Sequence, residues 1–134
     1  EKWRKELMVT WILWALILAM LAWMGFNYLR IRRAAKIVDN EEFEALIRTG
    51  QLIDLRDPAE FHRKHILGAR NIPSSQLKTS LAALRKDKPV LLYENQRAQR
   101  VTNAALYLKK QGFSEIYILS YGLDSWKGKV KVEK

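Results

Sequence analysis

QLIDLRDPAEFHRKHILGARNIP, residues 51–73, is the stretch of sequence that decides the fold. Its apolar start, residues 52–55, predicts a short strand, because its length and composition are those of buried strands. A proline and an acidic-aromatic pair then predict a short helical turn over residues 58–61. Gly68 and Pro73 mark the turns that follow. The stretch therefore predicts a strand, a helical turn and a turn-rich return segment in quick succession.

The segments on either side alternate between strand and helix patterns. Uninterrupted apolar runs such as residues 90–93 are typical of strands that are buried on both faces of a sheet. Asp39 has the properties of a helix cap, and Gly50 those of a helix end. Strand–helix alternation of this kind predicts an α/β domain with a mainly parallel sheet. The expected strands are residues 36–38, 52–55, 90–93 and 116–119, and the expected helices follow Asp39, cover residues 75–85, and carry Val101, Ala104, Ala105 and Leu108 on one face.

An apolar run without any charged side chain, residues 7–29, precedes the domain. As a helix it is about 35 Å long, which exceeds the roughly 30 Å hydrocarbon core of a bilayer. Trp11, Trp14, Trp23 and Tyr28 lie toward its two ends, as interfacial anchors do. The run is longer than the apolar region of a signal peptide, and no small-residue cleavage site follows it. We therefore expect an uncleaved transmembrane helix, and a buried helix of a soluble domain is the less favoured alternative.

The basic residues around this run predict its orientation. Three of them precede the run and four follow it between residues 30 and 36. The positive-inside rule then favours a cytoplasmic C-terminal part, in a single-pass protein of the plasma membrane. Such an architecture resembles that of bacterial membrane proteins. The predicted organisation is an N-terminal flank (1–6), a transmembrane helix (7–29), a basic juxtamembrane linker (30–35), the α/β domain (36–128) and a basic C-terminal tail (129–134), the tail being either solvated or a short edge strand.

The composition excludes several kinds of site. The 134 residues contain no cysteine, so disulfides, thiolate nucleophiles and metal sites built on sulfur are excluded. Two histidines are too few for most metal sites, and we expect neither a metal nor a cofactor. The net charge of +10 would suit nucleic acid, but no motif supports that use. We expect the bilayer and a protein partner instead.

Four motifs in order resemble those of the rhodanese (sulfurtransferase) homology domain. That family shows a D-x-R stretch, an acidic-aromatic pair, a G-H-I-P-G-A-x-N-I-P turn and a G-G-x-x-A-W ending. The matching segments here are Ile53–Asp57, Glu60–Phe61, His65–Pro73 and Tyr121–Trp126. The resemblance covers about residues 36–128 and implies a mostly parallel five-stranded sheet flanked by helices. For Asp54, Arg56 and His65, which lie in these motifs, we expect structural support of the fold rather than chemistry.

In active members of this family, the loop after the central strand reads roughly C-x-x-G-x-R, and its cysteine becomes a persulfide. Here the same loop runs Glu94, Asn95, Gln96, Arg97, Ala98, Gln99, Arg100. Counted forward from the strand, the cysteine position is Glu94. Counted back from the following helix and its terminal glycine, it is Asn95. Neither residue can carry a persulfide, so the resemblance implies a rhodanese-like domain without its nucleophile.

Three functions remain open for such a domain. It could be a non-catalytic interaction or regulatory module that holds a protein partner near the membrane. Its loop could bind phosphate or sulfate through Arg97, Arg100 and the amides of the helix start, unless Glu94 fills that position as an internal counter-ion. Finally, the domain could assist a sulfur-transfer partner that supplies its own cysteine.

Overall fold

The computed structural model describes residues 2–96 and 99–132. The chain forms two compact units, an N-terminal helix up to Arg32 and a domain from Arg33 onward. The predicted sites Arg97 and Ala98, and the last two residues of the predicted tail, lie outside the described residues.

Helix α1, Lys2–Ala34, contains the whole predicted apolar run. Its most apolar window has a mean hydropathy of 2.2 and none of that window is buried, so its length and composition suffice to cross a membrane. The helix also includes residues 30–34, which we expected to be a linker. Arginine is a good helix former, and the Arg32 guanidinium donates a hydrogen bond to the Tyr28 hydroxyl one turn earlier at 3.1 Å. These two properties favour continuation of the helix past the apolar run.

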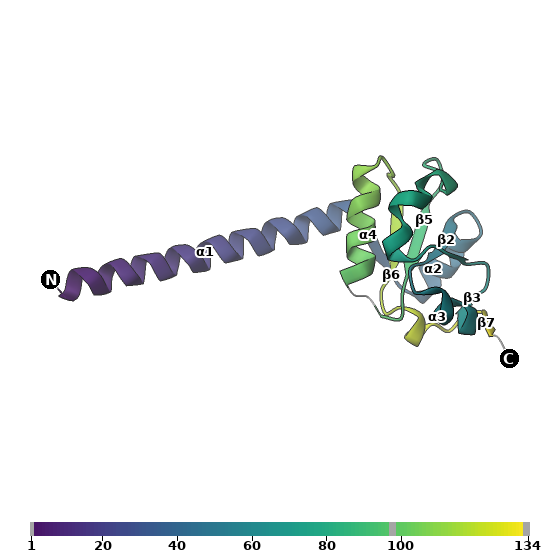
Figure 1. Cartoon of the computed structure of the whole chain (residues 1–134), viewed down its shortest axis with the longest axis horizontal. Coiled ribbons are helices and arrows are strands. Elements are labelled where there is room, and N and C mark those ends of the chain that lie inside the picture. The colour runs from purple at the N-terminus through teal and green to yellow at the C-terminus, as the bar shows by residue number, and fades with distance from the viewer. Residues whose placement is uncertain (1, 97–98, 133–134) are drawn as a thin grey trace. The chain divides into compact units, whose positions relative to one another are not determined.

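The domain is built on the predicted five-stranded parallel sheet (Figure 1). Its strand order is β1-β6-β5-β2-β4, with β5 central and buried along its whole length. Because every pair in this sheet is parallel, the carboxyl ends of all five strands meet at one edge. The strands are β1 (Lys36–Val38), β2 (Gln51–Asp54), β4 (Arg70–Asn71), β5 (Val90–Tyr93) and β6 (Ile116–Leu119).

Helices cover both faces of the sheet, as predicted. Helix α4, Gln99–Lys110, buries Val101, Ala104, Ala105 and Leu108 in the core of one face. Helix α2, Asn40–Ile47, buries Phe43 in the core of the other face. The Asp39 side chain caps α2 by accepting a hydrogen bond from the Glu42 N–H at 2.9 Å. The short helix α3, Pro58–Arg63, follows β2.

The segment 75–85 is not the α-helix that we expected. It forms two 3₁₀ helices, η1 (Ser74–Gln76) and η2 (Lys78–Ala83). Its hydroxyl side chains compete with helical backbone bonds, and the Thr79 hydroxyl indeed donates to the Gln76 carbonyl at 2.9 Å. Leu77 and Leu84 are nevertheless buried, so the apolar pattern correctly indicated the inward side.

The predicted C-terminal tail begins with a strand that belongs to the domain. Strand β7, Val130–Val132, pairs antiparallel with β3, Lys64–Ile66, in a second, two-stranded sheet. The Leu67 N–H also donates to the Lys129 carbonyl at 3.0 Å. The domain therefore extends past residue 128 to at least Val132, and the edge-strand alternative for this segment is the one observed. A last 3₁₀ helix, η3 (Leu123–Ser125), precedes it.

Candidate functional site

The candidate site is the loop that joins β5 to α4. It leaves the carboxyl edge of the sheet, where ligands of open α/β folds usually bind. Two backbone hydrogen bonds hold its first residues to the segment after Gly122. The Leu123 N–H donates to the Glu94 carbonyl at 2.8 Å, and the Asp124 N–H donates to the Asn95 carbonyl at 3.1 Å. The start of the loop is therefore fixed from outside.

The Glu94 side chain occupies the N-terminal end of α4. Its Oε2 accepts a hydrogen bond from the Val101 N–H at 2.9 Å. That amide belongs to the first helical turn, where N–H groups have no partner inside the helix and the helix dipole favours a negative charge. The contact is the one that an internal counter-ion would make.

The Asn95 side chain is held between an arginine and a glutamate. Its Oδ1 accepts from the Arg56 guanidinium at 3.0 Å, and its Nδ2 donates to Glu60 Oε2 at 2.8 Å. Glu94 and Asn95, the two alternatives for the cysteine position, thus both make polar contacts within the domain. The following Gln96 is exposed, with its amide 3.5 Å from an Asp124 carboxylate oxygen.

A buried ion pair between Arg56 and Asp54 supports the start of the loop. Arg56 Nε and Nη2 donate to the Asp54 carboxylate at 2.8–3.1 Å, and Arg56 also donates to the Lys64 carbonyl. Asp54 is fully buried and Arg56 is 5% exposed. Burial alone would lower the pKa of Arg56, but the Asp54 carboxylate raises it above the ordinary arginine value. A charged arginine therefore connects β2 to Asn95 in the loop.

His65 and Asn71 are held by backbone contacts. The His65 ring stacks on Phe61 with 3.9 Å between ring centroids, and its Nδ1 lies 2.8 Å from the Phe61 carbonyl oxygen. The Asn71 amide donates to the carbonyls of Asp54 and Arg56 at 3.2 and 2.9 Å. Both side chains join segments of the motif that decides the fold.

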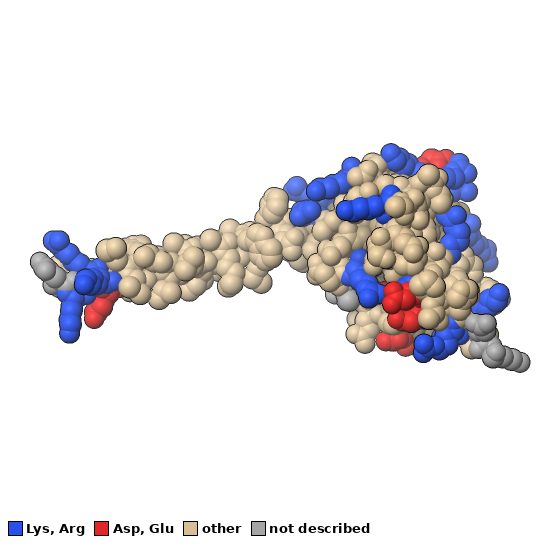
Figure 2. All heavy atoms as spheres, in the orientation of Figure 1, with Lys and Arg blue, Asp and Glu red and all other residues tan. Residues whose placement is uncertain are grey.

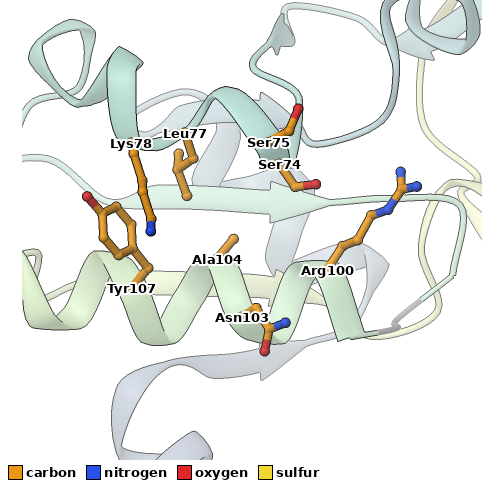
Figure 3. Close-up of a pocket in the computed structure, with 8 residues that line it drawn as sticks. All are labelled: Ser74, Ser75, Leu77, Lys78, Arg100, Asn103, Ala104 and Tyr107. Carbon is orange, nitrogen blue, oxygen red and sulfur yellow. The ribbon is translucent and has the colours of Figure 1, made fainter.

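Two cavities lie near the loop, and they divide the predicted residues between them. The first, of about 420 Å³, opens at the start of the loop and has mixed charge; it is lined by Arg56, Glu60, Arg63, Lys64, Asn95, Leu123 and Asp124. The second, of about 280 Å³, lies between η1 and α4; it is lined by Ser74, Ser75, Leu77, Lys78, Arg100, Asn103, Ala104 and Tyr107 (Figure 3). Arg100 thus belongs to the second cavity and not to the first. Gln99 lies along α4, with its amide donating to Asn103 Oδ1 at 2.9 Å.

The second cavity combines an apolar floor with cations at its rim. Leu77 and Ala104 are both buried and form part of its lining. The Lys78 ammonium lies 5.6 Å from the Tyr107 ring centroid. In Figure 3 the Arg100 side chain extends from α4 and passes to one side of Ser74 and Ser75. Among the ion pairs of residues 2–96 and 99–132, none involves Lys78 or Arg100.

Residues 39–129, more than half of the chain, match the Rhodanese-like domain family. The chain belongs to the rhodanese-like family. The thiosulfate sulfurtransferase GlpE of Stutzerimonas stutzeri strain A1501 is 36% identical over 95 residues, which cover 69% of this chain and 84% of GlpE. A rhodanese-related protein of Thermoplasma volcanium covers 73% of this chain and 99% of its own, with a TM-score of 0.66 and 24% identity, which shows the shared fold.

A further relative extends the similarity beyond the rhodanese-like domain. YqhL of Bacillus subtilis strain 168 is 47% identical over 116 residues, which cover 87% of this chain and 91% of YqhL. This match is longer than the domain unit from residue 33 to 134, so it reaches into α1. Part of α1 is thus included in the segment that the two proteins share.

Three residues of the rhodanese-like site were not among the predicted ones. Glu60 contacts Asn95, and Gly122 carries the backbone segment that holds the loop. Both residues lie in the family motifs, so the motifs could have identified them as part of the site. The Tyr93 hydroxyl accepts the Ile66 N–H at 3.1 Å, and burial raises its pKa far above the ordinary value, so it stays neutral. Residues 2–96 and 99–132 contain no cluster of three ligating side chains for a metal ion.

Proposed function

We propose that this chain is a membrane-anchored, non-catalytic rhodanese-like module that binds a protein partner close to the bilayer. The observation that carries the proposal is the hydrogen bond from the Val101 N–H to the Glu94 carboxylate, in a chain without cysteine. Helix α1 supplies the anchor, with the domain in the cytoplasm as the flanking charges favour.

The chemistry of the loop supports a non-catalytic role. Persulfide formation needs a thiolate that attacks the donor sulfur and keeps it in a new S–S bond. A carboxylate cannot form that bond, and the Asn95 amide is held by Arg56 and Glu60. The start of the loop therefore has a fixed polar surface, and the chain has no thiol nucleophile for sulfur transfer.

The first cavity, at the start of the loop, has the composition of a recognition surface, and we call it the mouth. It carries Arg63, Lys64 and Asp124, all exposed, next to the half-buried Glu60. Charges of both signs on a fixed backbone suit a partner with the complementary pattern, since such complementarity governs specificity and association rate. We therefore assign partner binding to this mouth.

Charge reversal at the mouth should remove the partner. In native membranes carrying the full chain, cross-linking and mass spectrometry should recover one partner, and Arg63→Glu with Lys64→Glu should lower its yield at least fivefold. Lys109→Glu with Lys110→Glu changes the net charge equally at the end of α4, at the opposite edge of the sheet, and should leave the yield unchanged. Equal loss in both variants contradicts a partner at the mouth. Thiosulfate:cyanide turnover of the wild-type chain above background contradicts the non-catalytic role.

The second cavity favours anion binding as a second candidate function. Arg100 and Lys78 lie at its rim with two serines, and none of the ion pairs within residues 2–96 and 99–132 includes either cation. Charge-assisted hydrogen bonds from such groups are the strong ones in proteins. Because Glu94 already occupies the helix-terminal amide, an anion is expected at Arg100 and not at the loop start.

A titration separates the two cavities. With phosphate, sulfate or thiosulfate at millimolar concentration, NMR amide signals near Ser75 and Arg100 should shift in the full chain in detergent micelles. Arg100→Ala should weaken this binding about tenfold or more, the effect of losing one charge-assisted hydrogen bond. Arg63→Ala, in the other cavity, serves as the control and should bind the anion as the wild type does. Shifts confined to the Glu94 amide region contradict the assignment.

A further inference from the structure

Basic side chains gather at the amino edge of the sheet, the end opposite the candidate site. The segments that lead into β5 and β6 carry five basic and two acidic residues, all exposed: Arg85, Lys86, Lys88, Lys109 and Lys110 against Asp87 and Glu115. This excess of three charges is half of the +6 carried by residues 36–134. Figure 2 shows Lys and Arg side chains gathered along this border of the domain. We call Lys86, Lys88, Lys109 and Lys110 the amino-edge patch.

The two segments of the patch are held beside each other. The Gln51 side chain, at the start of β2, donates to the Arg85 carbonyl at 2.7 Å and accepts the Arg85 N–H at 2.6 Å. The Lys86 ammonium lies 5.9 Å from the Phe113 ring centroid. A Cβ built on Gly112 would lie 3.4 Å from the same ammonium nitrogen. The turn before β5 therefore lies against the turn before β6, and their charges form one surface.

The single strong ion pair at this edge leaves the patch cationic. Arg85 and Asp87 pair at 2.6 Å between Nη2 and Oδ2, and both side chains are exposed. This pair neutralises one acidic residue, and Glu115 is the other one in the two segments. Among the ion pairs of residues 2–96 and 99–132, none includes a lysine of the patch. The patch thus presents four ammonium groups to an outside partner.

Chain connectivity keeps this edge within reach of the anchor. The apolar run ends at Leu29 and β1 begins at Lys36, seven positions further along the chain. Even fully extended, seven residues span at most about 25 Å. Strands β1, β6 and β5 are neighbours spaced by about 4.8 Å, so the starts of β5 and β6 lie within about 10 Å of the start of β1. If α1 crosses a membrane, the patch cannot be far from its surface.

We propose that the amino-edge patch docks the domain on the anionic lipid headgroups of the bilayer that α1 crosses. This inference rests on the anchoring part of the proposed function. Each basic residue close to an anionic leaflet strengthens attachment by roughly fivefold, and the effect decays within a Debye length of about 10 Å. The four lysines of the patch supply several basic residues, and the tether keeps them close to the leaflet. Docking by this edge leaves the carboxyl edge, with the Glu94 loop, accessible to a partner.

The absence of cysteine makes a direct test possible. The full chain, carrying a single Gln111→Cys or Tyr121→Cys substitution, is labelled with a fluorophore and inserted in lipid nanodiscs. Gln111 lies in the turn before β6, whereas Tyr121 follows β6 at the opposite edge and is exposed. With 30% phosphatidylglycerol, a nitroxide on the lipid headgroup should quench the label at 111 at least twice as strongly as the label at 121. In phosphatidylcholine alone, or at high salt, this difference should disappear.

Matched variants assign the effect to the patch. Lys88→Gln, Lys109→Gln and Lys110→Gln together should abolish the difference in quenching. Lys127→Gln, Lys129→Gln and Lys131→Gln remove the same charge and should leave it intact. Equal quenching at positions 111 and 121, in a chain that stays in the nanodiscs, overturns the docking proposal but not the anchoring by α1. A chain that does not co-float with phosphatidylcholine vesicles overturns the anchoring and, with it, docking on the same bilayer.

Discussion

Replacing Arg56 with alanine is expected to lower the free energy of unfolding of the domain by about 3–5 kcal/mol. Asp54 is fully buried, and the Arg56 guanidinium is its partner at 2.8 Å. Without that partner the Asp54 carboxylate would be a buried charge without compensation, and the Asn95 and Lys64 oxygens would lose a donor. Hydrogen exchange of the β2 and β5 amides, in the full chain in mild detergent, measures this loss independently of α1.

An exposed pair of the same chemistry is the control. Arg85 and Asp87 approach even more closely, at 2.6 Å, but their side chains are 61% and 64% exposed. Arg85→Ala should therefore leave exchange nearly unchanged, because water replaces the lost partner. Arg56→Lys should give an intermediate loss, since one ammonium cannot reproduce the contacts of the guanidinium. Equal effects of Arg56→Ala and Arg85→Ala would show that burial does not decide the strength of this pair.

Patterns within the sequence were sufficient for four strands of the parallel sheet and for helices α2 and α4, but not for β4 or for the 3₁₀ helices η1 and η2. Strand β5 is a continuous apolar run, and Val101, Ala104 and Leu108 lie at helical spacing, so both elements are encoded by neighbouring residues. The small β3–β7 sheet was not predicted as a pairing. Its strands have three residues each and lie more than sixty residues apart, so only the tertiary structure brings them together.

The loop was predicted less well than the fold, because the position of a side chain around α4 depends on where the helix begins. One residue more or less in the loop rotates each later side chain by about 100° around the helix axis. Counting could not distinguish Glu94 from Asn95, nor show that Arg100 lines the cavity of η1. The structure places Glu94 on the helix-terminal amide and Arg100 beside Ser74. The hydrogen bond of Glu94 and the position of Arg100 thus depend on the loop as folded.

Gly122→Ala is expected to destabilise the loop and the domain more than Gly68→Ala does. Both glycines have positive φ, 70° and 91°, which strains an alanine by about 1–3 kcal/mol. Gly122, with ψ −170°, also lies in a region that is essentially restricted to glycine. They differ in their surroundings. A Cβ on Gly122 would overlap the Asn95 carbonyl and lie 2.6 Å from the Glu94 carbonyl oxygen, whereas a Cβ on Gly68 meets nothing within 4 Å. The pair therefore compares a glycine that is packed against the loop with one that contacts nothing.

The overlap should cost a further 1–3 kcal/mol, roughly the cost of overpacking in a core. It pushes apart the backbone bonds from Leu123 and Asp124 to the loop, which fix Glu94 beneath the first turn of α4. Hydrogen exchange in Gly122→Ala should thus rise first at the Val101 and Leu123 amides, before the β5 amides follow. In Gly68→Ala those two amides should keep the protection of the wild type. Equal exchange at Val101 in both variants would mean that Gly122 does not hold the loop, and that the Glu94 contact is stable without it.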